Sequence, residues 1–327
     1  MSTEGSNRAI VAALAANLGI AATKFVAFLL TRSSSMLAES IHSLADSGNQ
    51  VLLLIGGKQA QRPATDDHPF GFGRSRYLYA FIVSVVLFSV GGLFALYEAY
   101  HKWHDPHGIE EWQWVPVVVL VAAIGMESYS FRTAIVEANQ IRKELSWWGF
   151  IRETKSPELP VVLLEDSAAL VGLVFALFGV AMTLITGDGH WDAVGTAMIG
   201  ILLVAVAVLL ALETSSLLLG EGAAATDVAK IKAALVGPGV DSVIHIRTMF
   251  VGPEELMVAA KIAVSPTELA RDVTEAIDAA EVRVRAAVPI ARLIFLEPDI
   301  ARPGGQAAVV PDGGVDVAAG PEDVGAA

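Results

Sequence analysis

Residues 191–219 read WDAVGTAMIGILLVAVAVLLALETSSLLL, and this stretch decides the class of fold. A helix needs about 20 predominantly apolar residues to cross a bilayer, and this stretch is long enough and apolar enough to do so. The rest of the chain has the same character, because 54% of its 327 residues are hydrophobic and only 17% are charged. A mean hydropathy of +0.56 predicts a membrane protein rather than a soluble globular one.

Six apolar stretches in all approach or exceed the length of a transmembrane helix. They cover approximately residues 9–30, 35–57, 77–100, 114–138, 159–186 and 191–219. Residues 1–8 lead directly into the first stretch without a small-residue cleavage site, so no cleavable signal peptide is predicted. The sequence therefore predicts a six-helix transmembrane domain over residues 1–219.

Basic residues in the short loops predict the orientation, because loops rich in lysine and arginine stay on the cytoplasmic side. The loops after the second and fourth spans contain Lys58, Arg62, Arg74, Arg76, Arg142, Lys143, Arg152 and Lys155. The other three loops contain only Arg32 and Lys102. Both termini are therefore expected to be cytoplasmic, and the expected location is the plasma membrane.

The chain after the sixth span is richer in charge, and its apolar stretches are short. A helix, two strands, a helix and a strand are predicted at residues 226–235, 242–251, 255–264, 266–287 and 291–298. This order, αββαβ, suits a small α+β domain with an open-faced sheet and two helices on one side, placed over residues 220–300. Residues 301–327 are too rich in Gly, Pro and Ala to fold and are predicted to be a disordered tail.

The overall charge and the lack of cysteine limit the chemistry that the chain can perform. A net charge of −13 argues against a nucleic-acid partner. The absence of cysteine excludes disulfides and thiolate metal sites, which leaves oxygen and imidazole ligands. No nucleophile elbow or phosphate-binding glycine loop is present, so neither an enzymatic activity nor a prosthetic group is predicted.

The second span contains an unusually polar stretch, ESIHSLADSGNQ at residues 39–50. Helical spacing puts four of its side chains on one stripe, namely Glu39, His42, Asp46 and Asn49. Ionisable groups at this depth cost at least about 2.5 kcal/mol each on insertion scales and usually mark a pathway or a partner. His42 and Asp46 are four residues apart and can share one cation. The alternative is bonding to neighbouring helices, which suits the serines of this stretch.

A second acidic pair, Glu165 and Asp166, lies in the fifth span. Adjacent residues on a helix point about 100° apart, so at most one aims straight at a given site, and Asp166 is preferred. Glu127 in the fourth span and Lys24 in the first are further charges, for which a salt bridge or a snorkelling lysine is the alternative to a transport role. One imidazole with two or three carboxylates suits Zn²⁺, whereas an all-oxygen cage favours Mn²⁺ or Mg²⁺.

Three motifs together resemble the cation diffusion facilitator family, and most of all its branch related to zinc transporter nine. They are SSSMLAESIHSLADSGNQ (33–50), DDHPFGFGRSRY (66–77) and LLEDSAALVGLVFALFGV (163–180). The resemblance extends from residue 8 to about 298. It implies a homodimeric exporter of divalent metal that exchanges Zn²⁺ for protons and carries a ferredoxin-like cytoplasmic domain.

The resemblance also implies a transport site made by two pairs of residues, each pair four residues apart. His42 and Asp46 match the pair in the second span, and Asp166 matches the aspartate in the fifth. The family's usual histidine four residues before that aspartate is Val162 here. Glu165 or a water molecule is therefore expected as the fourth ligand.

A second departure from the family lies in the loop after the second span. Many members carry HPxGHG there, whereas this chain has Phe72 in place of the second histidine. A loop site formed by Asp66, Asp67 and His68 is therefore expected to be weak or absent. His245 is the single histidine of the last domain, so that domain is expected to make dimer contacts rather than to bind two zinc ions.

The expected function is export of Zn²⁺ across the bilayer by alternating access, driven by an inward proton gradient. Metal would displace protons from His42 and the carboxylates, because ligands must be deprotonated to coordinate. Three alternatives are open: export of Mn²⁺, Fe²⁺ or Co²⁺ by the same fold, a metal-gated channel or sensor, and a membrane scaffold without transport.

Overall fold

The computed structural model describes residues 3–301, apart from 32–33, 107–112 and 143–144. Within the first two helices it leaves out the side chains of residues 3–9, 13, 27–28, 30–31, 34–39 and 41–42. The side chains of Glu39 and His42 are among these, so their predicted roles fall outside the described part of the chain. The predicted tail lies outside it as well, except for Ala301.

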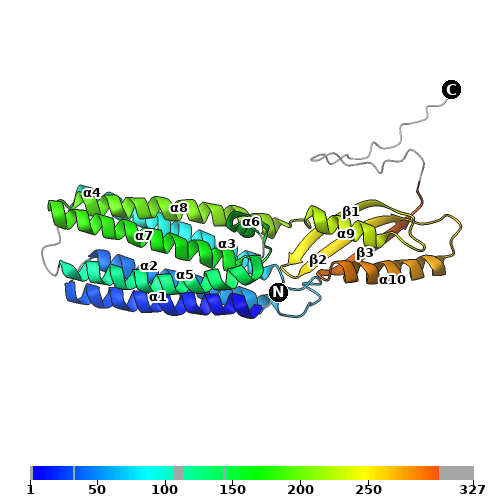
Figure 1. Cartoon of the computed structure of the whole chain (residues 1–327), viewed down its shortest axis with the longest axis horizontal. Coiled ribbons are helices and arrows are strands. Elements are labelled where there is room, and N and C mark those ends of the chain that lie inside the picture. The colour runs from blue at the N-terminus through cyan, green and yellow to red at the C-terminus, as the bar shows by residue number, and fades with distance from the viewer. Residues whose placement is uncertain (1–2, 32–33, 107–112, 143–144, 302–327) are drawn as a thin grey trace, which may run out of the picture. The chain divides into compact units, whose positions relative to one another are not determined.

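The first two thirds of the chain form a bundle of long helices (Figure 1). In chain order these are α1 (Thr3–Thr31), α2 (Ser34–Ala60), α3 (Ser75–Val86), the π-helix η1 (Leu87–Leu93), α4 (Phe94–His104), α5 (Trp114–Arg142), α6 (Trp147–Glu153), α7 (Glu158–Thr186) and α8 (His190–Leu219). Within the described residues, four helical stretches are long and apolar enough to cross a membrane: Ser75–His104, Trp114–Arg142, Glu158–Thr186 and His190–Leu219. They confirm the last four predicted spans. The first two predicted spans coincide with α1 and α2, and their crossing of the bilayer stays a prediction.

The C-terminal part has a helix, two strands, a helix and a strand, in the predicted order. The elements are α9 (Ala225–Leu235), β1 (Ser242–Gly252), β2 (Glu255–Ala263), α10 (Ala270–Ala287) and β3 (Ala291–Asp299). They include a three-stranded sheet of order β1-β2-β3, in which β2 and β3 run parallel. Parallel strands need a crossover connection, which α10 supplies.

The described residues divide into two compact units, residues 3–221 with 250–255, and residues 222–249 with 256–301. The domain boundaries predicted from the sequence stay predictions. In the second unit, alternate residues of β2 are buried, from Leu256 to Ile262, as expected for a strand with one covered face.

Close glycine contacts bring α7 and α8 together in the first unit. A methyl group on Gly179 would lie 2.9 Å from the carbonyl oxygen of Trp191 and 3.3 Å from Cα of Gly195. A methyl group on Gly195 would lie 2.8 Å from the carbonyl oxygen of Phe175. Small residues of this kind allow membrane helices to pack backbone against backbone, which fixes the wall that α7 and α8 contribute to the interior.

Gly179→Ala is therefore expected to destabilise the bundle by about 1–3 kcal/mol, because its methyl group must push two backbones apart. The matched control is Gly125→Ala on α5, where an added methyl group meets nothing within 4 Å. Thermal unfolding of the purified protein in detergent would measure both. Equal unfolding temperatures for the two variants would contradict this account of the α7–α8 contact.

Candidate metal site

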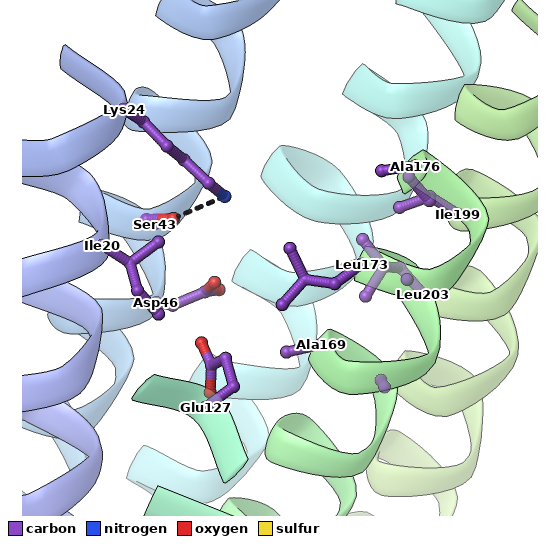
Figure 2. Close-up of a pocket in the computed structure, with 12 residues that line it drawn as sticks. Ile20, Lys24, Ser43, Asp46, Glu127, Ala169, Leu173, Ala176, Ile199 and Leu203 are labelled. Carbon is purple, nitrogen blue, oxygen red and sulfur yellow. Dashed lines mark hydrogen bonds between the residues drawn. The ribbon is translucent and has the colours of Figure 1, made fainter. Parts of the chain in front are cut away.

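Three charged side chains from three helices line one small cavity inside the bundle (Figure 2). Lys24 of α1, Asp46 of α2 and Glu127 of α5 border a space of about 40 Å³. All three are buried, with exposed fractions of 4%, 8% and 4% respectively. The remaining wall is mostly apolar and comes from Ile20, Ser43, Ala168, Ala169, Gly172, Leu173, Ala176, Ile199 and Leu203. Only a small, charged or strongly polar ligand suits such a space.

Glu127 has an unsatisfied oxygen in this cavity. Its Oε2 atom is buried and has no hydrogen-bond partner among the described residues. Figure 2 shows the carboxylates of Glu127 and Asp46 turned toward the same space. An unpaired carboxylate oxygen in a membrane interior is costly unless a cation or a proton joins it. The arrangement therefore favours a bound cation between these two carboxylates.

Asp166 of α7 does not line this cavity, but it is close enough to Asp46 and Glu127 to interact with both electrostatically. It is 2% exposed, and its Oδ2 accepts a 2.8 Å hydrogen bond from Oγ of Ser130. Ser130 lies one turn after Glu127 on α5, so both face the interior. Asp46, Glu127 and Asp166 are close enough to repel one another electrostatically. A divalent cation is the kind of ligand that would offset this repulsion.

Glu165 is held differently from its neighbour Asp166. Its Oε1 accepts a 2.6 Å hydrogen bond from Nδ2 of Asn49, and its Oε2 accepts a 2.8 Å bond from Nε2 of Gln50. Nδ2 of Asn17 in turn donates to Oε1 of Gln50 over 3.3 Å. Glu165 therefore faces α2, whereas Asp166 bonds to α5, as the 100° step between adjacent helical residues requires. The side chain of Glu165 thus connects α7 to α2 through the amides of Asn49 and Gln50, and Gln50 extends the connection to Asn17 of α1.

The other predicted site residues do not gather around the cavity. Asp66, Asp67 and His68 lie exposed in the loop after α2, and the ring of His68 stacks on Phe72 at 4.4 Å between centroids. Asn49 faces Glu165 rather than the cavity, and its buried Oδ1 has no partner among the described residues. Among the side chains that the structure describes, no three His, Asp or Glu residues lie close enough to hold a metal ion.

Val162, at the position of the family's usual histidine, is completely buried and belongs to the apolar core around α7. It stands one turn before Asp166 on the same helix. A packing residue thus stands where the resemblance leads one to expect a histidine. The side chain of His42, the predicted nitrogen ligand, is outside the described residues.

Sequence reasoning missed three polar residues that organise the site: Asn17, Gln50 and Ser130. A signal was present for two of them. Gln50 follows Asp46 by four residues and Ser130 follows Glu127 by three, so each shares a helical face with a charged residue already selected. For Asn17, the charged residue already selected in its span is Lys24, which lies on the same face but two turns later, so the signal was weaker.

Comparison with known proteins identifies the transmembrane part of the chain. The sequence profile of the cation efflux transmembrane domain matches residues 10–219. The chain is 30% identical over 268 residues to the mitochondrial proton-coupled zinc antiporter SLC30A9 of Xenopus laevis, a match that covers 80% of this chain and 47% of that protein. The human protein of the same name is 31% identical over 223 residues, covering 67% of this chain and 39% of its own length. The chain thus spans less than half the length of these relatives.

With a more distant relative, the matched region covers a larger share of the relative's own length. The magnetosome protein MamM of Magnetospirillum gryphiswaldense is 25% identical over 262 residues, which is 77% of this chain and 76% of that protein.

These relatives correct the expected location. The plasma membrane was expected, together with the cytoplasmic termini predicted from the basic loops, but the SLC30A9 relatives are mitochondrial by name. The expectation was wrong because loop charge reports which side of a bilayer a loop occupies and carries no information about which membrane that is.

Proposed function

The chain belongs to the cation diffusion facilitator family, and from this premise we propose that it transports divalent metal cations, with Zn²⁺ as cargo and protons as counter-ion. The family is established by the match over residues 10–219. The choice of cargo and the proton coupling are supported by relatives named as proton-coupled zinc antiporters. The observation that carries the proposal is the buried cavity between Asp46 and Glu127, where carboxylates face one another inside a transmembrane bundle.

The proposed ligands are His42, Asp46 and Asp166, with Glu127 in the fourth position. Zn²⁺ in proteins is usually tetrahedral and accepts imidazole and carboxylate ligands, so this set is chemically suitable. Glu127 is preferred to Glu165 because its Oε2 has no partner among the described residues, whereas both oxygens of Glu165 accept amide hydrogen bonds. Glu165 is then a positioning residue that holds α7 against α2.

The finer architecture follows the family resemblance. We propose six spans, with α1 and α2 as the first two, and a ferredoxin-like fold for the C-terminal domain, which the order αββαβ and the parallel β2–β3 pair support. The proposed assembly is a homodimer. The loop site at Asp66, Asp67 and His68 is proposed to be weak or absent, since Phe72 replaces a histidine and packs against the ring of His68.

Proton exchange follows from the ligand chemistry. Imidazole and carboxylate groups must lose their protons to coordinate a metal, so metal binding releases protons. When the site opens to the opposite side, protons compete for the same groups and release the metal, because the imidazole of histidine exchanges its proton close to physiological pH. A proton gradient across the membrane can therefore drive metal in the opposite direction.

The test is flux through the purified full chain in proteoliposomes, with a zinc indicator and a pH indicator recorded together. Zn²⁺ movement accompanied by proton movement in the opposite direction is expected. Zinc flux without proton movement would show a channel, and no flux of Zn²⁺, Mn²⁺, Fe²⁺ or Co²⁺ would show a sensor or scaffold. Either result would overturn the proposed function.

A matched pair of substitutions separates a ligand from a positioning residue. Glu127→Gln is expected to weaken equilibrium Zn²⁺ binding by about tenfold or more, because it removes a negative ligand from the cavity. Glu165→Gln is expected to leave Zn²⁺ affinity nearly unchanged but to lower the unfolding temperature, because a glutamine cannot accept from both Asn49 and Gln50. Titration calorimetry and thermal unfolding would measure the two effects. If Glu165→Gln weakens Zn²⁺ binding and Glu127→Gln lowers only the unfolding temperature, then Glu165 is the ligand and Glu127 the positioning residue.

A further inference from the structure

Lys24 is a buried cation beside the proposed metal site. It lies on α1, is 4% exposed, and its Nζ donates a 3.1 Å hydrogen bond to Oγ of Ser43. Ser43 is on α2, three residues before Asp46 and therefore on the same face. A snorkelling lysine would extend its ammonium to the membrane surface, whereas Figure 2 shows this one extended from α1 toward α2 and the cavity.

The charges around the cavity explain this position. Lys24, Asp46 and Glu127 line the same space of about 40 Å³, and Lys24 attracts Glu127 electrostatically. An ammonium group in a membrane interior is stable only with anionic or strongly polar partners, and carboxylates likewise need a cation. Without metal, the ammonium supplies part of the positive charge that these carboxylates require.

On the basis of the proposed function, we propose that Lys24 is a tethered counter-cation that competes with the transported metal for the carboxylates of the cavity. The space is too small for a dication and an ammonium to coexist without strong repulsion. Metal entry therefore turns the ammonium away from Asp46 and Glu127, and the ammonium returns as the metal leaves. Lys24 thus sets the affinity of the site at a level that permits release.

The competition predicts that removing the charge tightens metal binding. Lys24→Gln keeps a donor for Ser43 Oγ but is neutral, and Lys24→Met is neutral and apolar. Both are expected to lower the Kd for Zn²⁺ by about tenfold or more, since two like charges a few ångströms apart repel strongly even at an effective dielectric constant of about 20. Lys24→Arg keeps the charge and is expected to keep the Kd close to that of the wild type.

The matched control is Lys102→Gln. Lys102 of α4 pairs with Asp192 of α8 at 2.8 Å and does not line the cavity. The Lys102→Gln variant therefore loses the same charge elsewhere in the bundle, and its Kd for Zn²⁺ is expected to equal that of the wild type. A fall in Kd for Lys102→Gln as large as for Lys24→Gln would mean that only the overall charge matters and would overturn the proposal.

Titration calorimetry with Zn²⁺ on the purified full chain is the experiment, and thermal unfolding with and without Zn²⁺ accompanies it. If the neutral variants are unstable without metal, Zn²⁺ is expected to restore their unfolding temperature, because the ion replaces the lost ammonium. Instability that Zn²⁺ does not repair would overturn the proposal, as would an unchanged or raised Kd in both neutral variants. A wild type that binds no Zn²⁺ would instead refute the proposed function itself.

Discussion

Asp46→Asn is expected to reduce zinc flux in proteoliposomes about 100-fold or more, to the level of protein-free liposomes. The change keeps the size of the side chain but removes a negative charge from a cavity that contains few polar groups. Loss of an outer-shell partner alone commonly costs about tenfold to 100-fold in metal affinity, and a ligand is worth more. Asp166→Asn is expected to have the same effect.

The control for this experiment is Asp192→Asn, which removes a carboxylate that pairs with Lys102 at 2.8 Å between α4 and α8. Its zinc flux should remain near that of the wild type. All three variants should elute from a sizing column as the wild type does, because removing a charge from the membrane interior does not by itself unfold the bundle. Near-normal flux through Asp46→Asn would refute the site assignment.

The second large effect concerns the choice between metals. His42→Asp would make the proposed ligand set all-oxygen, which favours harder ions such as Mn²⁺ over Zn²⁺. The ratio of Zn²⁺ to Mn²⁺ transport is expected to fall by about tenfold or more. Competition flux assays with both metals in one preparation would measure it. An unchanged ratio with full activity would show that His42 is a packing residue.

The opposite change is expected from Val162→His, which would restore the family's second imidazole one turn before Asp166 and raise the ratio. Val162 is completely buried, so the larger ring is expected to cost about 1–3 kcal/mol of stability. Val161→His is the control, because Val161 is equally buried but points about 100° away on the helix. If both histidines shift the ratio alike, the effect comes from repacking rather than coordination.

The sequence predicted where the helices and strands lie better than it predicted which of them pack against one another. Spans such as 191–219 and the order αββαβ follow from composition and periodicity, which are local properties. The π-helix Leu87–Leu93 was not predicted, because its apolar residues do not distinguish it from the rest of the third span. The short helix Trp147–Glu153 was not predicted, because seven residues are too few to show a helical period. For η1, the close fit of Gly92 against Val204 of α8 is a tertiary contact that no local pattern encodes.

The same division holds at the site. Helical spacing placed Asp46 on a polar stripe, and it separated Glu165 from Asp166. It could not show that Glu165 is held by Asn49 and Gln50, since that contact depends on how α2 and α7 pack together. The position of Lys24 beside Glu127 depends on α1 and α5 in the same way.

We propose that transported metal binds between α2, α5 and α7 in the interior of the bundle. Anomalous scattering at the zinc absorption edge, from crystals of the zinc-loaded full chain, tests it most directly. An anomalous peak is expected at the cavity, within coordination distance of Asp46, Asp166 and Glu127, together with displacement of the Lys24 ammonium. A zinc peak only at the loop of Asp66 to His68, or none inside the bundle, would contradict it.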